Sequence, residues 1–299
     1  MHILSAFGAA VVGACLLAAN ASAAGVSLRL SSGIDFSKGD YGSATDTEIL
    51  TVPLRAALSV GDFEFSLASS YLDVTGSGNV IPGGAGPIVT QRCEQLRRAR
   101  PDLFDRFCRD RLSRDPVEER FSNSGIGDTI LGALWSLPQA TTGEWLVDLG
   151  ARVKLPTASE AKSLGTGKAD YSFSLDISRG FGPWTVYAGG GYRILGDPEI
   201  ENGTTGAAER IELKNGATAN AGVIYSFASG MNVSLGYDYL ARSITAATAT
   251  REAVLGLSLP LGDGGWRWSG YGVAGLSRSS VGFAGGFALF CCFGGLWVS

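Results

Sequence analysis

Histidine is almost absent from this sequence of 299 residues, in which His2 is the only one. Histidine is the usual general base and a frequent metal ligand, so catalysis by a Ser-His-Asp or Cys-His group would depend on this residue alone. His2 lies in an amino-terminal stretch that we expect to be removed, which leaves the rest of the chain with none. We therefore expect that the protein is not an enzyme and holds no histidine-bound metal.

Charged residues and cysteines are also few. Asp, Glu, Lys and Arg make up 17% of the chain, and 24 basic against 28 acidic residues leave a net charge of −4. This balance does not predict a nucleic-acid partner, since such proteins carry a basic surface. The cysteines show no C-x-x-C spacing, so no zinc, other metal or cofactor is expected. Cys93 and Cys108 share one polar segment, where an oxidising compartment could join them in a disulfide.

Long hydrophobic runs are confined to the ends of the chain. The apolar run from Ile3 to Ala19 is followed by Ala21 and Ala23, which fit an A-x-A cleavage site. We interpret 1–23 as a secretory signal peptide, with a buried or membrane-inserted helix as the alternative, and 24–299 as one domain. The uncharged stretch from Val281 to Val298 contains closely spaced aromatics and glycines, so a final strand is favoured over a helix.

What the sequence has in abundance is glycine, with 43 residues, and apolar residues at every second position. Between Trp145 and Leu155, apolar side chains alternate with Asp148, Gly150, Arg152 and Lys154. The same period of two recurs over 171–177, 184–194 and 233–239. A period of two is typical of strands, in which successive side chains point to opposite faces.

Strand length separates two kinds of β-protein. The alternating segments are about 10 to 14 residues long, which suits strands that cross a bilayer and exceeds the usual length in soluble sheets. Aromatic residues recur near the segment ends, as expected for the girdles of a membrane barrel. They are Trp135, Trp145, Trp184, Tyr225, Phe227, Trp266 and Trp268. A soluble periplasmic β-sandwich is the alternative.

The connections between segments alternate in length. We expect strands over 26–36, 47–59, 62–74, 125–137, 144–156, 168–180, 183–196, 211–227, 231–243, 249–261, 265–277 and 280–290. Every second connection is short and rich in Gly or Pro, whereas those between are generally longer and more polar. Bacterial outer-membrane barrels show this alternation of short periplasmic turns with longer external loops. The sequence predicts an all-β fold, a transmembrane antiparallel up-and-down β-barrel of about twelve strands with its amino terminus in the periplasm.

The longest connection, 75–124, is expected to be a partly helical external loop. Its segment 92–120 holds nine Arg and seven Asp or Glu, and Pro101 with Asp102 is typical of a helix start. We expect a short helical lid or plug stapled by Cys93 and Cys108. It is either a basic vestibule that attracts anionic solutes or a locally neutralised helix that blocks access or contacts lipopolysaccharide.

Charged residues on the polar face of the strands are the candidates for lining a pore. They are Arg55, Glu64, Asp128, Asp148, Arg152, Lys154, Asp170, Asp176, Arg193, Asp238 and Glu252. Mixed charges could line a narrow polar pore that selects solutes, and they could equally pair across the lumen and close it. A pair such as Asp148 with Arg193 is compatible with both arrangements.

The stretch from Lys154 to Asp170 is expected to leave the sheet and return to it. Pro156 cannot donate to the strand ladder, so the chain should leave the sheet there and form an external loop over 157–167. Gly165 and Gly167 would allow a positive φ at the return. Lys154 then ends one strand and Asp170 begins the next, both pointing into the lumen.

Several blocks of sequence, in this order and spacing, resemble the MetA-pathway of phenol degradation family of outer-membrane channels. The matching residues are Gly125-Ile126-Gly127-Asp128-Thr129, Lys154-Leu155-Pro156-Thr157, Leu164-Gly165-Thr166-Gly167 with Asp170, Gly180 to Trp184, Tyr192 and Gly196-Asp197. Ala158 stands where the family usually has glycine, and the chain continues past Phe290, so either Phe290 closes the last strand before a tail or the end of the barrel is atypical. The resemblance implies passage of small molecules, and it alone suggests aromatic or weakly polar compounds.

Together these observations predict a channel or transporter for small molecules in the outer membrane, exported through a cleaved signal peptide. Its expected partners are the lipid bilayer, lipopolysaccharide, a small-molecule solute and the outer-membrane assembly machinery. The alternative is a barrel that does not conduct and serves as a structural or surface-binding protein.

Overall fold

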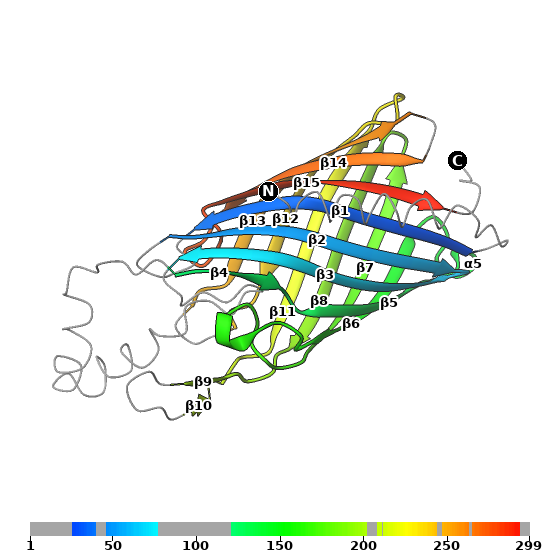
Figure 1. Cartoon of the computed structure of the whole chain (residues 1–299). Helices are drawn as coiled ribbons and strands as arrows, with labels where there is room; N and C mark the ends of the chain where they lie inside the picture. The colour runs from blue at the N-terminus through cyan, green and yellow to red at the C-terminus, as the bar shows by residue number, and fades with distance from the viewer. Residues whose placement is uncertain are drawn as a thin grey trace.

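Long antiparallel strands close into a single ring of sheet (Figure 1). The structure is a computed structural model that describes residues 26–39, 46–76, 121–201, 208–210, 212–243, 247–262 and 265–293. The expected signal peptide 1–23 lies outside these residues. So do Cys93, Cys108 and the expected helical lid.

The wall of the ring has twelve positions, as predicted. The strands are β1 (Val26–Gly39), β2 (Thr47–Val60), β3 (Phe63–Gly76), β4 (Phe121–Ile126), β5 (Thr129–Ser136), β6 (Leu146–Leu155), β7 (Asp170–Phe181), β8 (Trp184–Ile194), β11 (Gly216–Ser226), β12 (Asn232–Leu240), β13 (Thr250–Leu261), β14 (Trp266–Gly275) and β15 (Phe283–Phe293). This sheet has 13 strands, of which β4 and β5 both pair with β3 and share one position, so 13 − 1 gives 12. Pairing of β1 with both β2 and β15 closes the ring.

The fourth wall position is broken, whereas one continuous strand over 125–137 was expected. β4 pairs with the second half of β3, from Tyr71 to Gly76. β5 pairs with the first half of β3, from Phe63 to Ala68, and with β6. Gly127 and Asp128 form the break, and the Gly127 amide donates to the Ser70 carbonyl oxygen at 2.7 Å. A side chain at Gly127 would meet Leu72 and Ser70 at 3.0 Å. The side chains of Leu72 and Ser70 leave little room at this position, which explains the glycine, and the break places Asp128 outside the strands.

The connections are sorted by length between the two ends of the barrel. One end carries the short turns 61–62, 182–183, 227–231 and 262–265, together with 137–145, which contains the helical turn α5 (Gln139–Thr142). The opposite end carries the longer connections, including the 3-10 turn η2 (Glu160–Lys162) and the small hairpin β9 (Glu199–Glu201) and β10 (Ala208–Arg210), as Figure 1 shows. We call these the short-turn end and the long-loop end.

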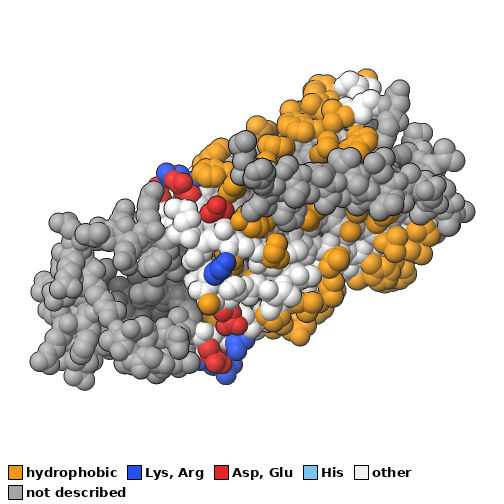
Figure 2. All heavy atoms as spheres, in the orientation of Figure 1, with side chains coloured by type: hydrophobic (Ala, Val, Ile, Leu, Met, Phe, Trp, Pro, Cys, Tyr) orange, Lys and Arg blue, Asp and Glu red, His pale blue; other side chains and the backbone are white. Residues whose placement is uncertain are grey.

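The two faces of the wall differ in chemistry. Most register pairs on the outer face are apolar, and Phe65, Phe173 and Leu255 are 52%, 54% and 59% exposed. Figure 2 shows hydrophobic side chains over the wall, whereas the charged side chains in this view gather toward the long-loop end. An exposed apolar surface of this extent is typical of a wall that contacts lipid, and it excludes the soluble sandwich. In the part of the chain that the structure describes, no helix is long and apolar enough to cross a membrane.

Aromatic side chains cluster on the outer face near the short-turn end. The ring of Phe63 stacks on Trp135 with centroids 6.1 Å apart. Tyr225 contacts both Trp184 and Phe227 edge-on, each at 4.7 Å. This cluster supports the predicted girdle at one end of the barrel.

Several expected boundaries were wrong. β3 and β4 extend into the expected insertion 75–124, because Thr75 and Gly76 pair with Ser122 and Phe121. The strand expected to begin at 211 begins at Gly216, since residues 212–215 belong to the long loop. The last strand continues past Phe290 to Phe293, because β1 offers pairing partners as far as Leu28.

Glycines on the inner wall make room for Tyr187 of β8. A side-chain carbon at Gly222 would lie 2.3 Å from the Tyr187 hydroxyl oxygen and 2.5 Å from the Leu235 carbonyl oxygen. We predict that Gly222→Ala lowers the free energy of unfolding by about 1–3 kcal/mol, because backbone and ring must both shift. Urea unfolding followed by tryptophan fluorescence measures the change.

Gly272→Ala is the matched control, because a side-chain carbon there meets nothing within 4 Å. It should leave the unfolding midpoint unchanged or slightly raised, since glycine weakens a strand. Equal midpoints for the two variants would contradict the packing of Tyr187 over Gly222.

Candidate functional site

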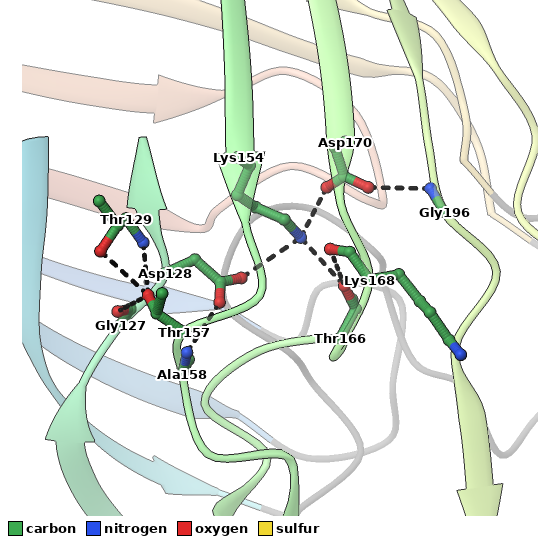
Figure 3. A network of polar contacts seen from close by, with 10 residues as sticks. All are labelled: Gly127, Asp128, Thr129, Lys154, Thr157, Ala158, Thr166, Lys168, Asp170 and Gly196. Carbon is green, nitrogen blue, oxygen red and sulfur yellow. Dashed lines mark hydrogen bonds and ion pairs between the residues drawn. The ribbon is translucent and has the colours of Figure 1, made fainter. Parts of the chain in front are cut away.

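A network of polar contacts centred on Lys154 lies where the lumen meets the long-loop end (Figure 3). Its ammonium nitrogen is 2.6 Å from Asp170 Oδ2, 3.3 Å from Asp128 Oδ2 and 3.0 Å from Thr166 Oγ1. The side chains of Lys154 and Asp170 are each 21% exposed, and that of Asp128 is 10% exposed. One cation is thus shared between two carboxylates and a hydroxyl in a largely desolvated place, where such contacts are stronger than in water.

Strand register brings the three charges together. Lys154, near the end of β6, is the cross-strand partner of Asp170, the first residue of β7. Both therefore point from the same face of the sheet, at the distance typical of neighbouring strands. Asp128 arrives from the other side, because it occupies the break between β4 and β5, next to the β6 strand.

Asp128 also holds the connection between β6 and β7, residues 156–169, which we call the latched loop. Its Oδ1 accepts a hydrogen bond from the Ala158 amide at 3.0 Å. Beside it, the Thr129 amide donates to Thr157 Oγ1 at 2.8 Å, and the two threonine hydroxyls lie 3.0 Å apart. The first two residues after Pro156 are thus bound to the broken wall position (Figure 3).

The apolar side of the latched loop packs on the inner wall. Leu164 and Ala158 are 2% and 8% exposed and form a cluster with Leu72 and Val74 of β3. Leu72 and Val74 lie in phase with Glu64, whose carboxylate meets Arg29 and Arg55 across the inner face of β1 and β2. The loop therefore folds against the inside of the barrel at its long-loop end and narrows the mouth.

Backbone conformation in the latched loop differs in part from the prediction. Gly167 has a φ of +64°, as expected, but Gly165 does not have a positive φ, and Ser163 at +54° has one instead. Gly165 is needed for space, because a side chain there would lie 2.8 Å from Ala158 Cβ and 2.9 Å from Asp128 Oδ2. The glycine therefore permits close approach of the loop to the network.

The next long loop is joined to the same network. Asp170 Oδ1 accepts a hydrogen bond from the Gly196 amide at 2.9 Å. Asp197 then accepts from the Leu213 amide at 2.8 Å and from the Arg210 guanidinium at 2.8 Å. The Leu213 hydrogen bond, with help from Arg210, holds the pKa of the Asp197 carboxyl below its usual value. This carboxylate ties both ends of the β9–β10 hairpin together.

Other expected pore residues form smaller groups in the lumen. Arg55 meets Glu64 at 2.9 Å, and Arg29 lies 3.7 Å from the same carboxylate. Asp176 accepts from Asn220 at 3.3 Å. Asp238 and Glu252 are cross-strand partners.

Asp148, Arg152 and Arg193 are expected pore residues that form no ion pair among the described residues. The cross-strand partner of Asp148 is another carboxylate, Asp176. Arg193 of β8 and Arg152 of β6 both have Ser172 of β7 as their cross-strand partner. Among the described residues no ion pair joins Asp148 to Arg193, the pair suggested from the sequence. Spacing along the chain does not determine which strands face one another across a lumen.

Several residues of the inner wall were not among the predicted pore residues. Asp35 accepts a hydrogen bond from the Tyr271 hydroxyl at 2.7 Å, and Thr166 binds Lys154 from within the loop. Tyr187 covers glycines of β11 and β12. Arg29, Asp35 and Tyr271 occupy inward-facing positions in the alternation of β1 and β14. The period of two in the sequence was therefore enough to predict that they face the lumen. Within the described residues no group of His, Cys, Asp and Glu could hold a metal ion.

Comparisons with known proteins agree with this architecture. The sequence pattern of the family described as "Putative MetA-pathway of phenol degradation" matches residues 58–259. An outer-membrane channel from Pseudomonas putida F1 has a similar fold, with a TM-score of 0.60 and 13% identity over 92% of this chain and 98% of that chain. No curated protein matches the sequence.

Two further solved structures are less similar. The translocator domain of the autotransporter NalP from Neisseria meningitidis has a TM-score of 0.48, with 10% identity over 97% of this chain and 96% of that chain. The toluene transporter TodX from P. putida has a TM-score of 0.44, with 10% identity over 92% of each chain.

Removal of the Lys154 charge should loosen the latched loop. We predict that Lys154→Met lowers the free energy of unfolding by about 1–3 kcal/mol, because it leaves Asp128 and Asp170 desolvated without their cation. Urea unfolding measures the loss, and faster proteolysis within 156–169 locates it.

Lys168→Met is the matched control in the same loop, since the Lys168–Glu199 pair is more exposed and should contribute little. Adding Asp128→Asn to Lys154→Met should recover part of the loss. A loss as large for Lys168→Met would contradict the role of the shared cation.

The Asp197 hydrogen bonds should make the hairpin loop sensitive to acid. A folded-state pKa below the unfolded value gives stability that is present above about pH 4 and lost as pH falls through the folded pKa. We predict that the protection of the Leu213 amide against hydrogen exchange, corrected for the intrinsic rate, decreases when the pH is lowered past about 4. In Asp197→Asn, protection should already be low at neutral pH and show no such step. An acid step retained in this variant would assign it to another group.

Proposed function

The chain belongs to the MetA-pathway of phenol degradation family, whose pattern covers more than half of it, and we propose that it is an outer-membrane channel for small molecules. The observation that carries the proposal is the difference between the two faces of a closed ring. The outer face is apolar and exposed, whereas the inner face carries hydroxyls, glycines and charges. Such a wall separates lipid from a polar interior.

The width of the barrel favours passage through the interior. A ring of about eight strands leaves an interior that side chains can fill, and the interior widens as strands are added. Many inward positions here also carry small residues, such as Ser174 of β7 facing Gly150 and Gly191 on either side. Twelve positions with small inward residues leave room for a solute path between the charged groups.

The inner wall favours solutes that form hydrogen bonds. Serine hydroxyls and charged groups lie beside the rings of Tyr187 and Tyr271, so the lumen offers both hydrogen-bonding groups and flat apolar surfaces. A small aromatic compound with a hydroxyl or similar polar group suits both, in agreement with the phenol named in the family description. We propose this class of solute, together with other weakly polar small molecules.

The same features support a location in the outer membrane. The apolar wall suits the outer membrane, with the long-loop end outside, next to lipopolysaccharide, and the short-turn end in the periplasm. Export would use residues 1–23 as a cleaved signal peptide, and insertion would require the outer-membrane assembly machinery. We do not propose an enzyme, because the residues after this segment contain no histidine.

The second candidate function is a barrel that does not conduct. The latched loop narrows the mouth, and Lys154, Arg55 and their partners neutralise one another in the lumen. A closed barrel of this kind would serve as a structural or surface-binding protein.

Two measurements test the proposal in order. First, the membrane-derived protein should migrate differently on a gel before and after boiling, as a folded barrel resists detergent until heated. Second, we expect current steps in a planar bilayer and a larger conductance for Lys154→Met, because the loop is released from the mouth.

Lys38→Gln is the matched control, since Lys38 pairs with Glu48 on the outer face and should not affect the current. Liposome swelling should then be faster with 4-hydroxybenzamide, an uncharged hydroxylated aromatic compound, than with a pentose of similar size. Silence in the bilayer while a known porin conducts would favour the barrel that does not conduct, and equal swelling rates would reject the solute class.

A further inference from the structure

Charged side chains are rare on the outer face of the barrel. Among the described wall strands, alternation and register place Lys38, Glu48, Asp73, Arg179 and Arg251 on this face. All except Arg179 lie near the long-loop end. Arg179 lies two residues before the end of β7, at the short-turn end, within the aromatic girdle. A cation on a lipid-facing wall is costly unless it has partners at the membrane interface, so this one calls for an explanation.

Aromatic rings hold the Arg179 guanidinium in place. Its central carbon lies 5.5 Å from the centre of the Trp145 ring and 5.0 Å from that of Phe181. Register explains both contacts: Leu146 pairs with Ser178, so Trp145 lies across from Arg179, and Phe181 follows two residues later on the same face. Cation–π contacts of this kind stabilise a cation that is partly removed from water.

A carboxylate completes the group. Glu144, which precedes β6, forms an ion pair with Arg179. The side chain of Glu144 is 75% exposed and that of Arg179 is 31% exposed, so both charges remain accessible from the interface. Because a guanidinium has five donors in a planar fork, one carboxylate leaves donors available for a second anion.

We propose that Arg179 and Glu144, with Trp145 and Phe181, form a binding site for the headgroup of a phospholipid in the periplasmic leaflet. The Arg179 guanidinium donates to the phosphate, for which its geometry is suited. Glu144 accepts from a headgroup ammonium, so phosphatidylethanolamine fits both charges. The two aromatic rings contact the glycerol region and the upper acyl chains, as amphipathic rings do at this depth.

The position of the group supports this occupant. Phospholipids form the periplasmic leaflet of an outer membrane, and the short turns of such barrels lie on that side. An ion pair that only stabilised the fold could lie anywhere on the surface. The Arg179–Glu144 pair lies on the lipid-facing wall, between aromatic residues of the girdle. The inference requires a barrel in a bilayer and does not require conduction, so a silent barrel that binds lipid would leave it intact.

Native mass spectrometry of the full chain in mild detergent tests the site with three probes. They are dioleoylphosphatidylethanolamine, dioleoylphosphatidylglycerol and dioleoylglycerol, which lacks the phosphate. The wild type should bind both phospholipids more tightly than dioleoylglycerol and should prefer the ethanolamine lipid. Arg179→Gln should weaken phospholipid binding about tenfold, the effect of losing one charge-assisted hydrogen bond, and leave dioleoylglycerol unaffected.

Two variants separate the site from general adhesion of lipid. Glu144→Gln should remove the preference for ethanolamine over glycerol headgroups while retaining the preference for phosphate. Lys38→Gln, a charge change on the same face at the opposite end, should change nothing. Gel migration before and after boiling verifies that each variant is folded.

The proposal is overturned if the wild type binds dioleoylglycerol as tightly as the phospholipids, or if folded Arg179→Gln retains them as the wild type does. Since the first comparison needs no variant, failure of Arg179→Gln to fold leaves the proposal testable. If Glu144→Gln keeps the ethanolamine preference, the assigned role of this carboxylate is wrong.

Discussion

Closure of the hydrogen-bonded ring is the constraint on which the rest of this structure depends. A strand edge exposed to lipid has no water to satisfy its amides and carbonyls, so a spanning sheet must pair every edge. Here β15 pairs with β1 from Leu28 to Lys38, and the first and last described strands complete the wall. Once the ring is closed, each residue is committed to lipid or lumen by its parity along a strand.

The one exception in this wall produces the candidate site. β4 and β5 interrupt the regular ladder at Gly127 and Asp128, and within the described residues only β5 continues the pairing to β6. The Thr157 hydroxyl of the latched loop accepts from the Thr129 amide and donates to the Gly127 carbonyl oxygen, and the Ala158 amide donates to the Asp128 carboxylate. Lys154 neutralises Asp128, which binds the latched loop, and Asp170, its partner across the strands. The break, the loop and the ion network therefore form one unit.

Different physical rules apply to charges on the two faces. In the lumen, carboxylates and cations can meet across strands, as Arg55 and Glu64 do. On the outer wall a charge must remain at an interface, which explains why Arg179 occurs among girdle aromatics beside an exposed carboxylate. Charged side chains thus pair with one another in the lumen, whereas on the outer face they are confined to the ends of the barrel.

Parity along the chain was sufficient to predict the two faces and the number of wall positions, though not every strand boundary, because a period of two is a local property of extended backbone. It put Lys154 and Asp170 at the two ends of a single connection, where the structure pairs them across β6 and β7. It did not reveal the break at Gly127, the partner of Arg193 or the inward fold of Leu164, because these depend on which strands become neighbours when the ring closes. The local pattern of the chain is thus enough for an antiparallel barrel with a polar interior and an apolar wall, whereas the pairing of charges is set only when the ring closes, since it depends on register across strands.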